Sequence, residues 1–342
     1  MKIIQLIVYT FLPGVLLAVD LPFVNKTLIV DVREQQFLMI NLTIGTPVQT
    51  IPVAVSPVAT DDQPAGYSDL VILGVQNKAG SFRWNDSKTF KKSEISYDFY
   101  KPHGPAGWIV SDTVGLGSLQ LNRNQNFRVF LNSTGNFSTL HLNLPTNGNP
   151  SAFIRDVLKK EKEQVIAFSF DSISPSGYSG IMSIGDRAPK RCANDWIIID
   201  EVPGNLQWMI EVEEVTTGKY SREIAGKLPV LIGVNDDYMV LPKDLAAEIC
   251  SDLGGQFCTY DDYFQVSCYQ TANISFKSPM GVDFVLTPDD YLDTSYGHDH
   301  CYLKVMKGPE KSARLPNAVL RDKCLLLDYA NFQVGLASRI KN

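Results

Sequence analysis

Concentrated positive charge, histidine and long apolar stretches are all scarce in this sequence of 342 residues. Lys and Arg number 31 against 37 Asp and Glu, which gives a formal net charge of −6. Binding to nucleic acid requires clustered Lys and Arg that neutralise phosphates, so DNA and RNA are not expected partners. The shortage of histidine limits metal sites and histidine-based catalysis to four candidates: His103, His141, His298 and His300.

After residue 18, no segment approaches the roughly 18 consecutive apolar residues that a membrane-spanning helix requires. The first 18 residues carry one positive charge, at Lys2, followed by an apolar run from Ile3 to Ala18 that contains a Pro-Gly pair. Because this run is short for a bilayer span, we predict that residues 1–18 form a signal peptide cleaved after Ala18. A signal anchor is the alternative, and the mature chain is expected to contain no membrane span.

Cysteine is absent from the first half of the chain, and the even number in the second half indicates disulfide bonds in an exported protein. No Cys-x-x-Cys spacing occurs, and the two histidines of Gly297–Cys301 point to opposite faces if that segment is extended. We therefore expect neither a metal site nor a cofactor. Secretion is predicted, with delivery to a lysosome as the alternative. Asn-x-Ser/Thr sequences predict glycosylation at Asn25, Asn41, Asn85, Asn132, Asn136 and Asn273.

The order of apolar segments is typical of an all-β chain. Two short helices are expected, at 151–160 and at 243–250, where apolar residues recur on one face. A polar break at Ser172–Gly180 divides the chain into halves with a faint similarity, which predicts two lobes, residues 19–172 and 173–342. Strands are expected at 37–44, 51–55, 108–110, 165–170, 197–199, 229–232 and 325–327.

Several segments, read in order, carry a resemblance to a known family. They include Ile40–Gln49 (INLTIGTPVQ), Ser111–Gly117 (SDTVGLG), Gly180–Gly185 (GIMSIG), Trp208–Val212 (WMIEV) and Leu320–Ala337 (LRDKCLLLDYANFQVGLA). Together they resemble the pepsin-like aspartic peptidases, especially the secreted nematode type. The resemblance spans nearly the whole mature chain. It implies a bilobal all-β fold, in which two related β-barrel-like lobes with few short helices flank a cleft.

The resemblance also implies how the cysteines pair. Cys268–Cys301 brackets the family-like segment Pro288–Tyr291, and Cys192–Cys324 is similar to a pair in nematode members. Cys250–Cys258 then remains as the third pair. A different connectivity is the alternative.

Peptidases of this family hold a water between two aspartates, one from each lobe, each within an Asp-Thr/Ser-Gly triplet. Two carboxylates at close range cannot both ionise, so one acts as base and the other as acid. In this chain the two triplets fall on Ser56–Val58 (SPV) and Gly233–Asn235 (GVN), and all six positions differ from the family. Neither Ser56 nor Gly233 can accept a proton in this mechanism, so no catalytic residue is expected at either position.

Other residues remain candidates for the site. The flap tyrosine of the family corresponds to Tyr97 or to Tyr100, depending on how the segment is counted. A serine nucleophile at Ser56 would need His103 or His141 as its base. Displaced carboxylates could replace the missing pair: Asp61 and Asp62 follow the first triplet, and Asp236 and Asp237 follow the second. Their distances along the chain from the two triplets are unequal, so no single shift restores a symmetric pair of carboxylates.

The sequence therefore predicts a secreted, glycosylated, monomeric homologue of aspartic peptidases that has no peptidase activity. Its expected partner is a peptide or protein segment bound in the cleft between the lobes. The first alternative is an active aspartic endopeptidase that uses displaced carboxylates. The second is a secreted structural or decoy glycoprotein with an empty cleft.

Overall fold

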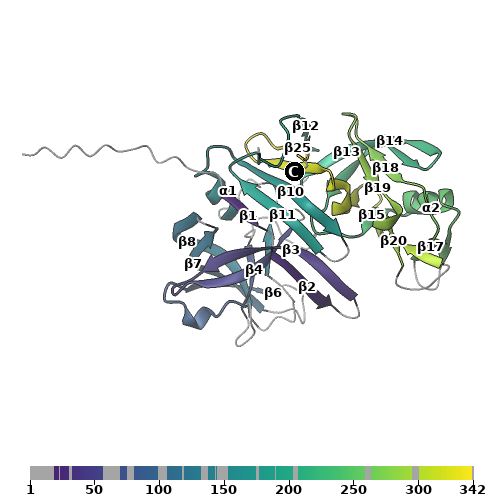
Figure 1. Ribbon diagram of the computed structural model, residues 1–342. Helices are drawn as coiled ribbons and strands as arrows, with labels where there is room; N and C mark the ends of the chain where they lie inside the picture. Colours follow the sequence, from purple (N-terminus) through teal and green to yellow (C-terminus); the bar gives the residue numbers. More distant parts are fainter. Residues whose placement is uncertain are drawn as a thin grey trace, which may run out of the picture.

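The predominance of strands that the sequence predicts is found in the structure, a computed structural model (Figure 1). Its few short helices and several sheets confirm the two-lobed all-β fold class. Within the described residues, no helix is long and apolar enough to cross a membrane. The structure describes residues 19–22, 24–30, 33–56, 70–74, 81–98, 106–117, 119–131, 138–142, 144, 153–174, 177–188, 190–202, 207–258, 263–294 and 300–340, so the predicted signal peptide lies outside it.

Strands from the first part of the chain form an eight-stranded sheet, drawn in purple to blue in Figure 1. An additional pairing between its second and seventh strands curls the sheet upon itself. Ile51, Val53 and Val55 alternate on the buried face of one strand, as expected for a period of two. In sheet order the strands are β2 (Val24–Val30), β3 (Arg33–Ile44), β4 (Gln49–Ser56), β9 (Ser138–His141), β5 (Leu70–Gly74), β8 (Leu119–Leu131), β7 (Ala106–Leu116) and β6 (Lys91–Asp98).

Strands from the second part of the chain form a seven-stranded and a four-stranded sheet. In order, the larger sheet contains β19 (Asp283–Leu286), β18 (Ile274–Lys277), β13 (Met209–Thr217), β14 (Tyr220–Ile232), β23 (Ala313–Leu315), β15 (Met239–Pro242) and β22 (Val305–Gly308). The smaller contains β16 (Gln256–Cys258), β17 (Tyr263–Ser267), β21 (His300–Leu303) and β20 (Leu292–Asp293).

The eight-stranded and seven-stranded sheets repeat one pattern of pairing. In the first, β3 is antiparallel to β4, β4 is parallel to β9, β9 is antiparallel to β5 and β5 is parallel to β8. In the second, β13, β14, β23, β15 and β22 follow the same succession of directions. This repetition gives the faint similarity of the two halves a structural basis, and it relates individual strands of one sheet to strands of the other.

A six-stranded sheet joins the two repeats, and its strands come from both ends and the middle of the chain. Figure 1 shows β10 and β11 between the purple-to-blue strands and the green strands. The predicted break at Ser172–Gly180 overlaps the paired ends of β10 and β11, where Ser174 lies opposite Gly177, and the division into residues 19–172 and 173–342 stays a prediction. In order, the strands are β1 (Val19–Pro22), β11 (Gly177–Ile184), β10 (Val165–Ser174), β24 (Lys323–Asp328), β25 (Gln333–Ser338) and β12 (Ile197–Asp200).

Both faces of this six-stranded sheet are covered. Along β10, Ile166 and Phe168 face the main core, which continues through both repeats. Val165 and Ala167 point the other way into a second, smaller core with Cys192. A strand buried on both faces reads as a continuous apolar run, and this explains why VIAFSF is such a clear strand signal in the sequence.

Two of the helices lie where the sequence predicts them. The helix α1 (Phe153–Leu158) buries four apolar side chains, and α2 (Lys243–Asp252) is followed by Gly254, whose φ is +69°. The helix α3 (Pro288–Tyr291) was not expected, because four residues show no periodicity. Two short 3₁₀ helices complete the described elements: η1 (Trp84–Asp86) and η2 (Asn317–Leu320).

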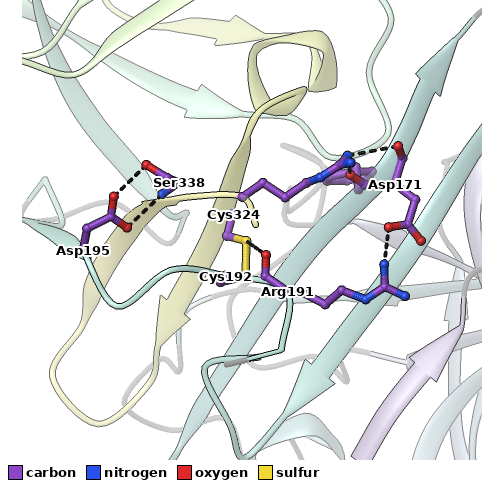
Figure 2. The surroundings of a disulfide bond; sticks show 8 residues. Asp171, Arg191, Cys192, Asp195, Cys324 and Ser338 are labelled. Atoms are coloured by element: carbon purple, nitrogen blue, oxygen red, sulfur yellow. Dashed lines mark hydrogen bonds and ion pairs between the residues drawn. A yellow bond between two sulfur atoms is a disulfide. The ribbon is translucent and has the colours of Figure 1, made fainter. Parts of the chain in front are cut away.

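The structure contains two of the three disulfides that the resemblance implies, Cys192–Cys324 and Cys268–Cys301. Figure 2 shows Cys192–Cys324 within a set of polar contacts: Arg191 pairs with Asp171, and Asp195 accepts hydrogen bonds from Ser338. These contacts fasten the segment before β12 across one face of the six-stranded sheet. Cys250 is buried, but the side chain of Cys258 lies outside the described residues, so that pairing stays a prediction.

Candidate functional site

The repeated pairing pattern places Ser56 and Gly233 at corresponding positions. Ser56 is the last residue of β4, and Gly233 directly follows β14, the strand that corresponds to β4. The registers agree as well, because Val55 lies opposite Leu140 on β9 and Ile232 lies opposite Leu315 on β23. The two positions selected by counting along the sequence are therefore equivalent in the fold.

Ser56 lies beside His141. The two residues are register partners on the parallel strands β4 and β9, and the carbonyl of Ser56 accepts a hydrogen bond of 2.7 Å from Leu142 N. His141 is 7% exposed, so this imidazole belongs to the interior. Of the two bases considered for Ser56, the structure thus brings one to a neighbouring position, whereas His103 lies outside the described residues.

The space beside Gly233 is filled by a carboxylate. A Cβ added to Gly233 would lie 1.9 Å from Oδ2 of Asp236, far inside contact distance. The other oxygen of Asp236 lies 3.5 Å from Nη1 of Arg314 on β23. The loop after β14 is also held by its backbone to β23 and the residues that follow it. Gly233 N donates to Leu315 O at 2.8 Å, and Asn317 N donates to Asp236 O at 3.0 Å.

Asn235 reaches from this loop into the eight-stranded sheet. Its Oδ1 accepts a hydrogen bond from Leu38 N on β3, and its Nδ2 donates to Val55 O on β4 at 2.5 Å. Nδ2 also lies 3.4 Å from Leu38 O. The third residue of the second triplet is therefore bonded to the residue that immediately precedes Ser56.

Burial raises the pKa of the Asp236 carboxyl above its ordinary value of 3.8. The guanidinium of Arg314 acts in the opposite direction, and the neighbouring Asp237 raises the pKa further. A raised pKa favours the protonated carboxyl in the folded chain, so Asp236 favours folding most at low pH and this contribution is lost as pH rises through the folded pKa. The protonation of Asp236 therefore depends on its burial and on the charges of Arg314 and Asp237.

Substitution of these neighbours is expected to move the pKa of Asp236 in opposite directions. Arg314→Met removes the cation and should raise the pKa, whereas Asp237→Asn removes a like charge and should lower it. Titration of the Asp236 carboxyl carbon by NMR measures both shifts. Equal values in the wild type and both variants would contradict this account of the site.

Several residues predicted for the site are not described. Asp61, Asp62 and Tyr100 lie outside the described residues, and Tyr97 lies on β6 without a described side chain. The identity of the flap tyrosine and the rescue by Asp62 therefore stay predictions. Of the remaining candidates, Asp236 lies against Gly233, and Asp237 beside it is exposed.

Sequence reasoning missed two residues of this site. No motif in the sequence indicates that the guanidinium of Arg314 lies by Asp236. Asn235 was noted as a replacement for glycine, without its bonds to β3 and β4. The signal available was the polar side chain of Asn235 at a position where the family has glycine.

The exposed acceptor sequences are compatible with glycosylation, which stays a prediction. Asn41, Asn85 and Asn273 have exposed side chains. Asn25 lies on β2 without a described side chain, and the remaining two, Asn132 and Asn136, lie outside the described residues. In the part of the chain that the structure describes, no group of three or more His, Cys, Asp and Glu side chains could hold a metal ion.

Comparison with known proteins identifies similar sequences. The pattern of the family described as "Eukaryotic aspartyl protease" matches residues 38–339. Two curated relatives, each named "Probable aspartic-type endopeptidase CTSD", come from Arthroderma benhamiae and Trichophyton verrucosum. Each is 22% identical over 280 residues, which cover 76% of this chain and 53% of the relative. The chain thus spans about half the length of the curated relatives that it matches.

Proposed function

This chain belongs to the eukaryotic aspartyl protease family, and we propose that it is a member without peptidase activity. The proposal is carried by one observation: the two equivalent positions at the ends of β4 and β14 hold Ser56 and Gly233, neither of which has a carboxylate. Peptide hydrolysis by a shared-proton dyad requires two carboxylates that face each other. A serine and a glycine cannot supply them.

We propose that the protein instead binds an extended peptide or protein segment between its lobes after secretion. Support comes from the retained strand framework, since a binding surface built from strands does not depend on the catalytic triplets. The disulfides and the family membership are compatible with a secreted or a lysosomal protein. The absence of peptidase activity would make the bound segment a partner rather than a substrate.

A second candidate function is peptidase activity with a displaced carboxylate. The specific observation in its favour is that Oδ2 of Asp236 lies where a side chain at Gly233 would begin. Asp62 would then have to provide the second carboxylate. Against it, the Arg314 guanidinium pairs with Asp236 and competes with the proton sharing that a dyad requires.

An assay with a labelled, denatured protein substrate from about pH 2 to pH 7 separates the two functions, since acid dyads work in this range. We expect no cleavage that pepstatin inhibits. Pepstatin-sensitive cleavage by the pure protein that Asp236→Asn abolishes would establish the second function instead. Cleavage that is unchanged in Asp236→Asn and Asp237→Asn would eliminate these residues as the dyad.

Peptide binding is tested with a library of displayed peptides. Asp237 is exposed beside the site, so Asp237→Trp should block binding without disturbing the core. The control Lys219→Trp changes another exposed residue, in the β13–β14 turn, and should bind as the wild type does. If no peptide is captured by the wild type, a structural or decoy role for the glycoprotein is favoured.

A further inference from the structure

One side chain joins the two repeats beside the positions of the missing carboxylates. Asn235 lies in the loop after β14 of the seven-stranded sheet, while its partners Leu38 and Val55 lie on β3 and β4 of the eight-stranded sheet. These partners are 197 and 180 residues away along the chain. The contact is therefore tertiary and connects elements that belong to different sheets.

The chemistry of the partners dictates the orientation of this carboxamide. Leu38 N is a donor and Val55 O is an acceptor, so the oxygen must face the first and the nitrogen the second. The reversed amide would place its oxygen 2.5 Å from a carbonyl oxygen and its NH₂ against an N–H. The site requires one acceptor and one donor in a fixed arrangement, which a neutral asparagine provides.

We propose that Asn235 is a positioning residue that fixes the loop after β14 against the end of β4, and we call these three contacts the Asn235 clasp. The glycine that the family has at this position cannot make them. A half-buried side chain that satisfies main-chain groups on both β3 and β4 stabilises one relative placement of the two sheets, because loss of the partner leaves those groups unpaired. These contacts do not depend on whether the protein cleaves peptides.

The Asn235 clasp contains no charged group. Charged residues lie near it on the side of the loop after β14, whereas the adjoining parts of β3 and β4 carry none. Residues 38–44 of β3 and the whole of β4 contain no charged residue. On its own loop, Asp236 and Asp237 follow it, and Arg314 on β23 pairs with the first of these. The hydrogen bonds of the clasp are therefore expected to persist over a range of pH in which a pair of carboxylates would change its charge.

A second contact between the repeats is independent of Asn235. Nε1 of Trp208, just before β13, donates a buried hydrogen bond of 2.5 Å to the carbonyl of Leu142, just after β9. The ring of Trp208 also packs edge-on against Tyr329, with 4.8 Å between the ring centroids. Variants of Asn235 are thus expected to fold, with a loosened contact rather than separated sheets.

The experiment compares Asn235→Leu and Asn235→Asp at neutral pH and at about pH 3, below the ordinary pKa of a carboxyl group. Leucine has nearly the same shape but no polar atoms, so its Tm should fall by about 2 to 6 °C at both pH values. Aspartate should lower Tm at least as much at neutral pH, since its carboxylate faces the oxygen of Val55. At low pH the protonated carboxyl donates to that oxygen again, and most of the loss should be recovered.

A matched control and a local readout complete the test. Asn194 is exposed, so Asn194→Asp should follow the wild type at both pH values. Hydrogen exchange at the Leu38 amide, which donates to Asn235, should accelerate in Asn235→Leu, while exchange at Leu326 in the six-stranded sheet should not change. The proposal is overturned if the Leu38 amide stays as protected as in the wild type, or if the Asn235→Asp deficit is the same at both pH values.

Discussion

Restoring the family aspartate at position 233 is expected to destabilise the protein by about 3 kcal/mol, because extra atoms would be forced into occupied space. The new Cβ would lie 1.9 Å from Oδ2 and 2.8 Å from Cβ of Asp236. Either Asp236 rotates and leaves Arg314, or the loop backbone shifts away from Leu315 and Asn317. Chemical denaturation of wild-type and Gly233→Asp protein measures the loss.

A double-mutant cycle tests whether Asp236 is the cause. Asp236→Ala removes the two atoms nearest to the new Cβ, so Gly233→Asp should cost about 1.5 kcal/mol less in that background than in the wild type. Two sites that do not interact would instead give the same cost in both backgrounds. Gly233→Ala isolates the contribution of the Cβ alone. A cost of Gly233→Asp that is independent of the residue at 236 would contradict the occupied space described here.

The loop after β14 has no space for a side chain at position 233. A carboxylate at 233 and the present conformation of Asp236 exclude each other, so replacement of one residue cannot return this half of the site to the family pattern. We do not expect Gly233→Asp to gain peptidase activity, since Ser56 still lacks a carboxylate in the other repeat. Activity in this single variant would contradict the requirement for a second carboxylate at position 56.

Removal of the Cys192–Cys324 disulfide is expected to lower the free energy of unfolding by about 5 kcal/mol, because this bond closes a long loop and so restricts the unfolded chain strongly. Its cysteines are 132 residues apart in the sequence. Both are buried in the smaller core of the six-stranded sheet, so alanine also loses packing there. Denaturation of Cys192→Ala/Cys324→Ala protein measures the effect.

The other disulfide of the described chain provides a matched control. Cys268 and Cys301 are 33 residues apart. Loop-closure entropy depends on the logarithm of loop length, so Cys268→Ala/Cys301→Ala should cost roughly 1 kcal/mol less than the first double variant. A larger loss from the shorter loop would show that packing, rather than restriction of the unfolded chain, determines the contribution of each bond.

Segments with strong local signals could be predicted from the sequence. The run at 165–170 is buried on both faces and forms the first part of β10, and the segment 243–250 forms most of α2. The helix α3 was missed because four residues show no periodicity. Its local signal is a capping box, in which Asp290 accepts hydrogen bonds from the amide and hydroxyl of Thr287, with Pro288 at the first helical position. The ion pair of Asp290 with Arg321 comes from a distant segment, which local propensity does not reveal.

For the candidate site too, positions along the chain could be predicted from the sequence, whereas contacts between distant segments could not. Counting from neighbouring motifs selects positions 56 and 233, which stand at corresponding ends of β4 and β14 in the two sheets. Contacts across the fold could not be derived, because Asn235 meets residues 180 and 197 positions away and Arg314 reaches Asp236 from another strand. Their hydrogen bonds depend on how two sheets pack, for which the sequence alone has no local signature.

The make-up of the six-stranded sheet also has a consequence for synthesis of the protein. The strand β10 lies between β11 and β24, and β24 in turn lies beside β25 near the end of the chain. As the nascent chain leaves the ribosome, β10 and β11 can form their hairpin early, but the other edge of β10 stays open until residues 323–328 have been made. An open apolar edge pairs readily with other chains. We therefore expect the interval between these two events to be the most aggregation-prone stage in the life of the molecule.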